Sequence, residues 1–369
     1  MRENTRNIFI TGATGFLASN FLQTLLAEEK NRLYTLIRAK DNSSLLRRKD
    51  ALIKELFAKD ARNRAASRMH VFRGDISKKG LGLGKKELDG LRDTIDVVYH
   101  SAAICDFSCE LDLIRKANVT GTENVLELAL DWQKNGHLEN VNHISTAYIA
   151  GDYSGTFYEK DTDVSQNFNN TYEQSKFEAE LVVSEYRKKS LRVDIYRPAI
   201  ITDTFPPSTG ASFGIIKLLR LISQGTFRNI PADGEARINL APVDLVSRAI
   251  HLISTAKDRP ANRNYHIVNP MPAKFDALLD TISGFFGTKK PVCIPAKRFP
   301  ADGLSDIQKR ILKHFIPYMN QRLSFDAQNA VSVLKKYGFT IPALSKSDLV
   351  KTFEHYQSSG FTTKKNRFS

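Results

Sequence analysis

The sequence predicts an α/β fold with a Rossmann-type, doubly wound parallel sheet and a smaller, mostly helical C-terminal region. Up to about residue 201, short β-rich apolar runs alternate with amphipathic stretches, a pattern typical of a parallel sheet with helices on both faces. The first run leads through the glycine turn ITGATG into a helical pattern. The last hundred residues are predicted to be helices separated by Pro and Gly.

The elements are predicted from apolar runs bounded by turn residues. The candidate strands are 7–11, 33–37, 69–73, 96–100, 141–145, 193–197 and 265–269. Amphipathic helices are predicted at 16–30, 120–132 and 215–225, and the basic segment 38–68 is predicted to be an extra helix. Residues 205–214 are predicted to be a Pro/Gly/Ser loop, and 235–269 a return of the chain to the sheet.

The composition excludes several classes of protein. No run of 18 apolar residues occurs, so no transmembrane segment is expected, and the N-terminus shows no signal peptide. Three cysteines in 369 residues indicate a reducing compartment, and we expect a cytoplasmic protein. Because Cys105 and Cys109 have no matching second cysteine pair, no metal site is expected.

The excess behind the formal net charge of +14 is partly local, in two basic segments. Residues 38–68 carry ten Lys/Arg against four Asp/Glu. The second segment contains Lys289, Lys290, Lys297, Arg298, Lys309, Arg310 and Lys313. Such charge fits coenzyme A, an acidic carrier protein or an acidic cofactor, or simply a solvated surface. Nucleic acid is disfavoured because no aromatic residues are interleaved with the basic clusters.

The turn after the first strand has the pattern of a dinucleotide site. Gly12 permits a tight turn, Gly15 lets the backbone approach a phosphate, and the third position needs only a small residue, here Ala18. The second strand ends in Ile-Arg-Ala-Lys with no acid before Asp41. Because Arg38 suits a 2′-phosphate better than a ribose hydroxyl, the sequence favours NADPH over NADH.

A second motif predicts the chemistry. Tyr172 and Lys176 lie one turn apart on a predicted helix. We expect the lysine to lower the pKa of the phenol, so that the phenol protonates a reduced carbonyl, and to bond the nicotinamide ribose. Ser145 and Thr146, at the end of a predicted strand, supply hydroxyls to hold the substrate oxygen.

The order of these motifs resembles the extended short-chain dehydrogenase/reductases from residue 7 to about 270. The matching motifs are TGATGFLA (11–18), RGD (73–75), VYHSAA (98–103), ANVTGT (117–122), ISTAYIAG (144–151), YEQSK (172–176) and YRPAI (196–200). The thioester reductase branch, which includes carboxylic acid reductase terminal domains and fatty acyl-CoA reductases, is the most similar. The motifs that resemble this branch are TGATGFLA, LIRAKD (36–41), YEQSKFEAE (172–180), APVDLV (241–246), residues 314–330 and SSGF (358–361).

The resemblance implies four catalytic residues. Tyr172 would donate the proton, and Lys176 would tune it and bind the ribose. Thr146 would bind the substrate oxygen, with Ser145 as the alternative. Asn118 would be the structural or water-relay asparagine; an alternative is that it caps the following helix.

The resemblance also implies a cofactor site. Asp75 would contact the adenine edge, or be an ordinary turn residue; Ala102 would line the cleft, and Pro198 would lie beside the nicotinamide. His100 and His143 are predicted to be packed histidines rather than bases. The cofactor-binding set is Gly12, Thr14, Gly15, Phe16, Leu17, Arg38, Lys40, Asp75, Ile76, Ser101, Ala102, Ala103, Asn118, Tyr172, Lys176, Pro198 and Ile200.

The predicted function is NADPH-dependent reduction of an acyl thioester, on coenzyme A or a carrier protein, to an aldehyde and in a second turnover to an alcohol. Residues 1–201 with about 235–269 would bind NADP, and 202–234 with 270–369 the substrate. Because no adenylation or carrier segment is recognised, the acyl group is expected to arrive already activated.

The alternatives are a ketone, hydroxy-compound or nucleotide-sugar dehydrogenase or epimerase, and a catalytically idle NADPH-binding regulator or RNA-binding scaffold. The complete Thr-Tyr-Lys-Asn set argues against an idle protein.

Overall fold

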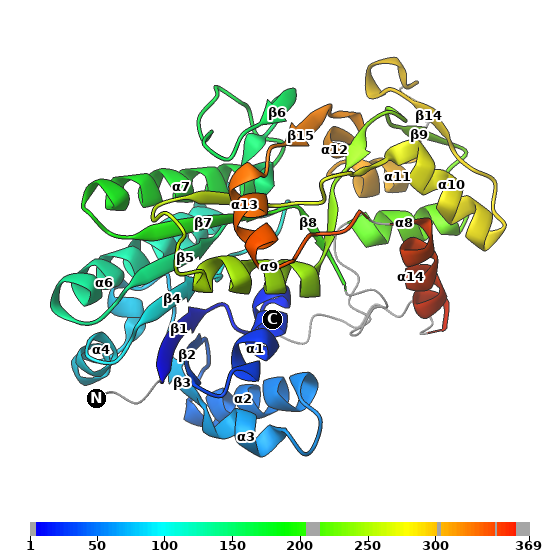
Figure 1. Ribbon diagram of the computed structural model, residues 1–369. Coiled ribbons are helices and arrows are strands. Elements are labelled where there is room, and N and C mark those ends of the chain that lie inside the picture. Colours follow the sequence, from blue (N-terminus) through cyan, green and yellow to red (C-terminus); the bar gives the residue numbers. More distant parts are fainter. Residues whose placement is uncertain (1–4, 204–214, 301–303, 344, 359–369) are drawn as a thin grey trace.

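A seven-stranded, all-parallel sheet organises the computed structural model, which describes residues 5–203, 215–300, 304–343 and 345–358 (Figure 1). The strand order is β12-β7-β5-β4-β1-β2-β3. The strands are β1 (Arg6–Thr11), β2 (Asn31–Ile37), β3 (Met69–Arg73), β4 (Val97–His100), β5 (Asn140–Ile144), β7 (Val193–Pro198) and β12 (Asn264–Ile267). The predicted fold class and all seven predicted strands are confirmed.

The strand order reverses beside β1. From β1 the chain builds outward through β2 and β3, then returns to the other side of β1 and continues through β4, β5, β7 and β12. The last residue of β1, Thr11, is level with the last residue of β4, His100. Open α/β sheets bind ligands at the carboxyl ends of the strands where such a reversal occurs. The fold therefore places its binding crevice beside the end of β1.

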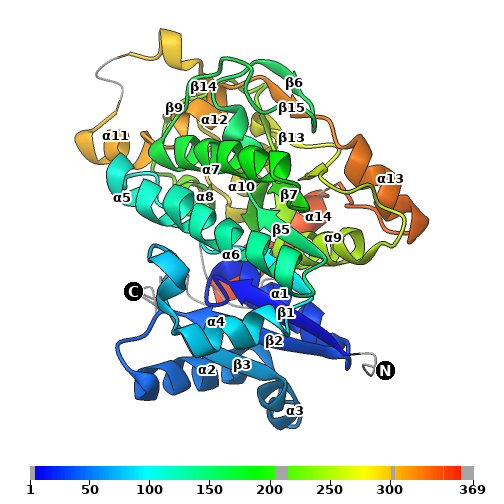
Figure 2. The same cartoon turned by 90° about the vertical axis from the view of Figure 1, so that its left-hand side faces the viewer.

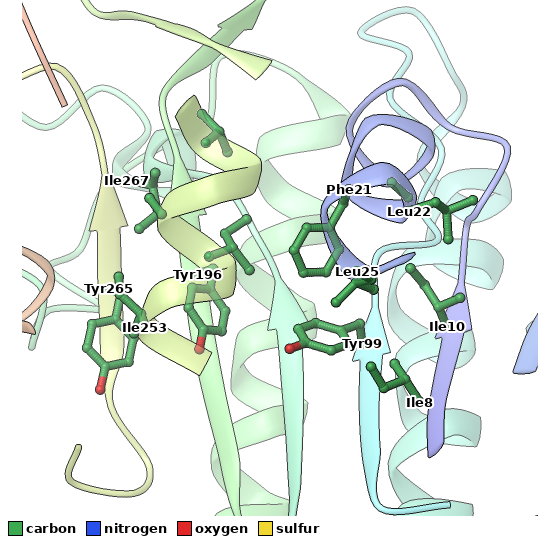
Figure 3. Close-up of a cluster of buried hydrophobic side chains, with 14 of the residues drawn as sticks. Ile8, Ile10, Phe21, Leu22, Leu25, Tyr99, Tyr196, Ile253, Tyr265 and Ile267 are labelled. Atoms are coloured by element: carbon green, nitrogen blue, oxygen red, sulfur yellow. The ribbon is translucent and has the colours of Figure 1, made fainter. Parts of the chain in front are cut away.

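One face of the sheet is covered by two long helices that pack on aromatic and aliphatic side chains (Figure 3). They are α1 (Phe16–Ala27) and α9 (Val243–Thr255). Phe21 of α1 meets Tyr99 of β4 edge to face, with ring centroids 4.9 Å apart. Leu22, Leu25 and Ile253 are also fully buried. This packing fixes α1 against the sheet, so the turn before α1 has a defined position.

Helices α4, α6 and α7 cover the opposite face (Figure 2). Their bounds are Lys85–Arg92, Gly121–Asn135 and Thr171–Lys188. Trp132 of α6 is 2% exposed and meets Phe9 of β1 edge to face, with centroids 5.4 Å apart. Because α6 and α7 lie side by side on this face, residues from both reach the carboxyl ends of β4 and β5.

The basic segment 38–68 forms two helices, not the single helix predicted. They are α2 (Asn42–Leu56) and α3 (Arg62–Ser67). The first helix ends where Phe57 turns extended and packs against the apolar cluster under α1. Arg62 then donates from Nε to the Phe57 carbonyl at 3.1 Å, which satisfies a group at the helix end.

The C-terminal region has its own apolar core beyond β7 and β12 (Figure 1). Its helices are α8 (Ile215–Ser223), α10 (Phe275–Phe286), η4 (Ala296–Arg298), α11 (Asp306–Leu312), α12 (Ile316–Asn320) and α14 (Lys346–Ser358). The described residues also form four two-stranded pairs outside the main sheet: β6 (Gly155–Phe157) with β15 (Leu323–Phe325), β8 (Ile200–Thr202) with β11 (Leu240–Pro242), β9 (Asn229–Pro231) with β14 (Val292–Ile294), and β10 (Arg237–Ile238) with β13 (Ala273–Lys274).

Two further features complete the fold. Helix α13 (Gln328–Lys336) packs back on α9 and β12, so part of the C-terminal segment lies against the sheet. Within 235–269 only β12 joins the main sheet, while β11 pairs with β8. The predicted loop 205–214 lies outside the described residues. Among the helices that the structure describes, none is long and apolar enough to cross a membrane.

Candidate active site

The β1–α1 turn is a tight cradle beside the end of β4. Gly12 has φ of +77°, and a Cβ there would lie 2.5 Å from the Ala102 backbone nitrogen. No other residue type fits without moving that strand end. Gly15 donates its N–H to the Gly12 carbonyl at 2.8 Å, which closes the turn. The two glycines and Ala102 therefore lie together, as the sequence predicts.

The first turn of α1 is open for an anion. Gly15 is the N-cap and offers no side-chain hydrogen bond, and the first turn, with Phe16 and Leu17, contains no acid. Ala18 is 2% exposed and packs in the core, so a small residue is sufficient at the third position of the motif. A helix N-terminus of this kind presents backbone N–H groups and a partial positive charge to a phosphate. The cradle thus fits a dinucleotide pyrophosphate.

Basic side chains gather where β2 and β3 end. Arg38 and Lys40 are exposed, and Arg73 donates from Nη1 to the Lys40 carbonyl at 3.4 Å. Asp41, the first acid after β2, accepts the Ser44 backbone N–H at 2.6 Å and caps α2. Because Asp41 is engaged as a cap, this strand end presents guanidinium and ammonium groups. Arg73, which is part of the RGD motif, was not among the predicted site residues but lies beside Lys40.

The loop after β3 is fixed on α6. Oδ1 of Asp75 accepts from the Ser77 backbone N–H at 2.9 Å and from its hydroxyl at 2.8 Å, as an ordinary turn residue does. Burial raises the pKa of Asp75, but the Ser77 bonds and the charge of Arg38 outweigh it, and the pKa lies below its usual value. Ile76 packs on Gly121, where a Cβ would come within 2.7 Å of its side chain.

His100 is a packed histidine, as predicted. It is 1% exposed, with Nδ1 2.7 Å from Thr11 Oγ1 and Nε2 3.0 Å from Thr122 Oγ1. Burial lowers its pKa to about 3, so the ring is neutral. Thr11 Oγ1 also accepts the Ala102 N–H at 3.3 Å. The histidine therefore ties the ends of β1 and β4 to α6.

Asn118 does not cap a helix; it lies inside one. It is fully buried in a π-helical turn, Lys116–Thr120 (η2), between α5 (Leu111–Arg115) and α6. Its side chain accepts the Ile104 N–H at 2.7 Å and donates to the Ile104 carbonyl at 3.0 Å and to Ser175 Oγ at 2.9 Å. The capping alternative is therefore wrong, because the wide turn aims the amide at the loop after β4 and at α7.

The strand-end hydroxyls differ in their surroundings. Thr146 begins the 3₁₀ turn Ala147–Ala150 (η3), and its Oγ1 accepts the Tyr148 N–H at 3.2 Å. A hydroxyl that accepts here still has its proton to donate to a substrate oxygen. Ser145 Oγ is buried and has no hydrogen-bond partner among the described residues. Both hydroxyls lie at the carboxyl end of β5, beside α7.

Lys176 is anchored against the same strand end. Its Nζ donates to the Ile144 carbonyl at 2.8 Å and lies 3.4 Å from Nε2 of His143. Both His143 and Lys176 are buried. Burial and the Lys176 charge lower the His143 pKa well below 6.5, so this ring is neutral, as predicted. Burial lowers the pKa of Lys176 to about 8, although the charge of Glu180 opposes the shift.

Tyr172 lies in the first turn of α7 and is partly buried. The expectation of a lowered pKa for this phenol is wrong for this structure. Burial and a hydrogen-bonded Cys105 thiol raise the pKa well above 10, and the charge of Glu173 adds to the shift. The ring lies 5.9 Å from that of Phe107. Tyr172 is therefore a protonated phenol at neutral pH, as a proton donor must be.

Four more predicted residues lie at or just after the ends of β4 and β7. Ser101 donates its N–H to the Thr11 carbonyl at 3.3 Å, and Ala103 is exposed in the next turn of the loop. Pro198 ends β7, and Ile200 donates its N–H to the Asn239 carbonyl at 3.2 Å. Next to Tyr172 and its helix the structure also places residues that were not among the predicted site residues: Phe107, Glu173, Ser175 and Tyr318.

Known proteins share this sequence and architecture. A family model described as Male sterility protein, NAD_binding_4, matches residues 10–250. The L-2-aminoadipate reductase large subunit of Eremothecium gossypii is 31% identical over 278 residues, which cover 71% of this chain. The Drosophila melanogaster fatty acyl-CoA reductase wat is 27% identical over 288 residues, or 70% of this chain. The chain spans 19% and 55% of the lengths of these two relatives.

A solved structure extends the likeness to nearly the whole chain. The terminal R domain from the myxalamid PKS-NRPS biosynthetic pathway superposes with a TM-score of 0.80 at 25% identity. The superposition covers 98% of this chain and 93% of that domain. The C-terminal region is therefore arranged on the sheet domain as it is in that R domain.

Proposed function

The chain belongs to the family described as Male sterility protein, and from this premise we propose that it is a nicotinamide-dependent reductase of acyl thioesters. The motifs' resemblance to extended short-chain dehydrogenase/reductases, in the thioester reductase and fatty acyl-CoA reductase branch, is confirmed by the relatives. The observation that carries the proposal is the bond from Lys176, one turn after Tyr172 on α7, to the Ile144 carbonyl at the end of β5, two residues before Thr146.

The crevice fits the cofactor. Gly12 and Gly15 would hold the pyrophosphate at the start of α1, and Lys176 would bind the nicotinamide ribose. When bound, the cofactor supplies a hydride to the carbonyl carbon. NADPH is proposed over NADH because Arg38, Lys40 and Arg73 gather at the strand ends while Asp41 is engaged as a cap.

The residues of the chain supply the proton and the hydrogen bonds. Thr146 and Tyr172 would both donate to the thioester oxygen, and each such donor is typically worth about 3 kcal/mol of transition-state stabilisation. Tyr172 then gives its proton to that oxygen as the carbon gains the hydride. The ammonium of Lys176, one turn along α7, stabilises the phenolate left behind. Asn118 holds the loop after β4 and, through Ser175, the first turn of α7.

The product follows from the leaving group. The protonated adduct is a hemithioacetal, and cleavage of its C–S bond releases a thiol and an aldehyde. A second hydride and proton on the aldehyde give the alcohol. Residues 202–234 and 270–369 are proposed to form the substrate side, and residues 1–201 with about 235–269 the cofactor side.

The thioester is proposed to arrive on coenzyme A or on an acidic carrier protein. The segment 289–313 is strongly basic, and His314, which follows it, lies 3.0 Å from Ser108 Oγ in the loop that carries Phe107. The residue after the basic segment therefore contacts the loop next to Tyr172. The three cysteines are free, which fits the reducing, cytoplasmic setting expected from the sequence.

A substrate panel tests the proposal. NADPH oxidation is followed with acyl-CoAs, acyl carrier proteins, ketones and UDP-sugars. Oxidation with thioesters supports the proposal. Turnover of ketones or UDP-sugars without turnover of thioesters assigns the chain to the dehydrogenase or epimerase alternative.

A further inference from the structure

One short segment of the C-terminal region touches the turn that carries Tyr172. The Tyr318 hydroxyl, from α12, accepts from Asn170 Nδ2 at 2.8 Å and donates to Glu173 Oε1 at 2.5 Å. Asn170 is the N-cap of α7, and Glu173 is the residue after Tyr172. Oε2 of Glu173 accepts the Asn169 N–H at 2.9 Å. Both hydrogen bonds of the Tyr318 hydroxyl are therefore made to residues at the start of α7, the helix that carries Tyr172.

The same segment touches the turn that carries Thr146. Three residues after Tyr318, Gln321 donates from Nε2 to the Gly151 carbonyl at 2.5 Å and to the Tyr153 carbonyl at 3.1 Å. Gly151 ends the turn that Thr146 begins. The chain then enters β15, which pairs with β6. Residues 318–321, named here the brace, thus contact the turns of both proposed hydrogen-bond donors.

Ring contacts join the brace to the reacting phenol. The Tyr318 ring lies 5.1 Å from Tyr148, at 84°, and 6.1 Å from Phe107. Phe107 lies 5.9 Å from Tyr172. Tyr318 is 6% exposed and Glu173 is 0% exposed. The Glu173 carboxylate accepts from Tyr318 and from Asn169, and a buried carboxylate is costly to leave unpaired, so removal of Tyr318's hydroxyl acts directly on the turn of Tyr172.

We propose that Tyr318 and Glu173 are positioning residues of the reaction. They hold Tyr172 and Thr146 at the spacing that lets both hydroxyls reach the same substrate oxygen. The inference rests on the proposed function, because it assumes that Tyr172 is the proton donor. Under this proposal the C-terminal region would bind the acyl group and would also position the proton donor for the chemical step. A misplacement of reacting groups by about 1 Å costs about 10²-fold in rate.

The pair also has a titration signature. Burial raises the pKa of Glu173 to about 7, and the hydrogen bonds from Tyr318 and Asn169 oppose the shift. The other titratable groups that face Glu173 are Tyr172 on its own helix, Tyr148 on the turn after Thr146, and Asp152 after that turn. Below pH about 7 the carboxyl gains a proton and no longer accepts from both donors, so the brace loosens.

The test compares Tyr318→Phe, which keeps the ring, with Tyr337→Phe, an exposed tyrosine on the end of α13. We expect kcat of Tyr318→Phe to fall by about tenfold or more, with an unchanged KM for the thioester and unchanged NADPH affinity. Tyr337→Phe should match the wild type. In the pH profile, Tyr318→Phe should move the acid limb of kcat to higher pH, because a bond that lowers the Glu173 pKa is lost. Glu173→Gln should remove this limb.

The outcomes are separable. A folded Tyr318→Phe enzyme with wild-type kcat and an unmoved acid limb overturns the inference and leaves the proposed function standing. If Tyr318→Phe fails to fold, Asn170→Ser keeps a helix cap and removes only the donor to Tyr318, and it should lower kcat in the same direction. Wild-type kcat in Asn170→Ser then counts against the inference. A wild-type enzyme that reduces no carbonyl compound of the panel overturns both proposals.

Discussion

Lys176 donates from Nζ to the backbone carbonyl of Ile144 at 2.8 Å. This bond fastens the helix that carries Tyr172 to the strand that leads into Thr146. The ammonium is buried and its pKa is lowered to about 8, because burial disfavours the charged form. The site therefore holds a cation whose charge depends on pH in the physiological range.

The pH profile of kcat follows from this lysine. Lys176 is charged below its pKa and neutral above it, so turnover should fall as pH rises through about 8. Lys176→Arg is the matched variant, because a guanidinium keeps its charge at that pH. Whatever activity the arginine enzyme retains should lose the alkaline limb. If kcat of Lys176→Arg still falls as pH rises through about 8, a group other than Lys176 titrates in that range.

Tyr172→Phe tests the proton donor. The change removes the phenol oxygen at nearly constant volume, and kcat should fall by at least ~10²-fold with NADPH affinity nearly intact. Stopped-flow reduction and calorimetric cofactor binding measure the two quantities. Tyr158→Phe, at an exposed position, serves as the control. The assignment fails if the Tyr172 variant keeps most of its turnover.

Arg38→Asp tests the cofactor preference. Loss of a charge-assisted hydrogen bond should weaken NADPH binding by about 1.5–3 kcal/mol, while NADH is affected far less. The control is Arg32→Asp, at an exposed position near the start of the same strand, β2. Calorimetric titration with both cofactors measures the difference. An equal loss for NADPH and NADH removes Arg38 from the 2′-phosphate site.

Charge reversal of Lys289, Lys297 and Arg298, all exposed, tests the partner surface. It should raise KM for a carrier-bound thioester and leave a short thioester unchanged. Increasing salt should lower kcat/KM for the carrier-bound substrate in the same way, because exposed charges are screened beyond about 10 Å at 0.1 M. Lys290 is left intact, because it pairs with Asp276 at 2.8 Å and Asp280 at 2.9 Å. If charge reversal and salt affect the carrier-bound and the short thioester equally, the basic surface does not bind the carrier and serves only solubility.

Gly12→Ala tests the cradle. The new Cβ meets the Ala102 backbone at 2.5 Å and the residue keeps φ of +77°, which costs about 1–3 kcal/mol of stability for the backbone alone. Gly90→Ala, within α4 and with open space around its Cβ, is the control. Thermal unfolding and NADPH binding should both weaken in the first variant only. Wild-type cofactor affinity in Gly12→Ala contradicts the proposed position of the pyrophosphate.

The sheet and the cradle were predictable because their signals are local. Each strand is a short apolar run, and the glycine turn is contiguous with the helix that it starts. The partner of Glu173 was not predictable, because Tyr318 lies 145 residues away and only the folded chain brings them together. That Asp41 caps α2 was not predictable either, because the bounds of α2 within the basic segment were not defined by the sequence alone. The pKa of Tyr172 depended on burial, which no motif reports.

The most direct test of the central claim counts thiol released against NADPH oxidised with an acyl thioester as substrate. Reduction to the aldehyde predicts one free thiol per NADPH, and continued reduction to the alcohol predicts one thiol per two NADPH. Both signals should fall together in Tyr172→Phe. Oxidation of NADPH by ketones or UDP-sugars, with no thiol released from any thioester, would contradict the account.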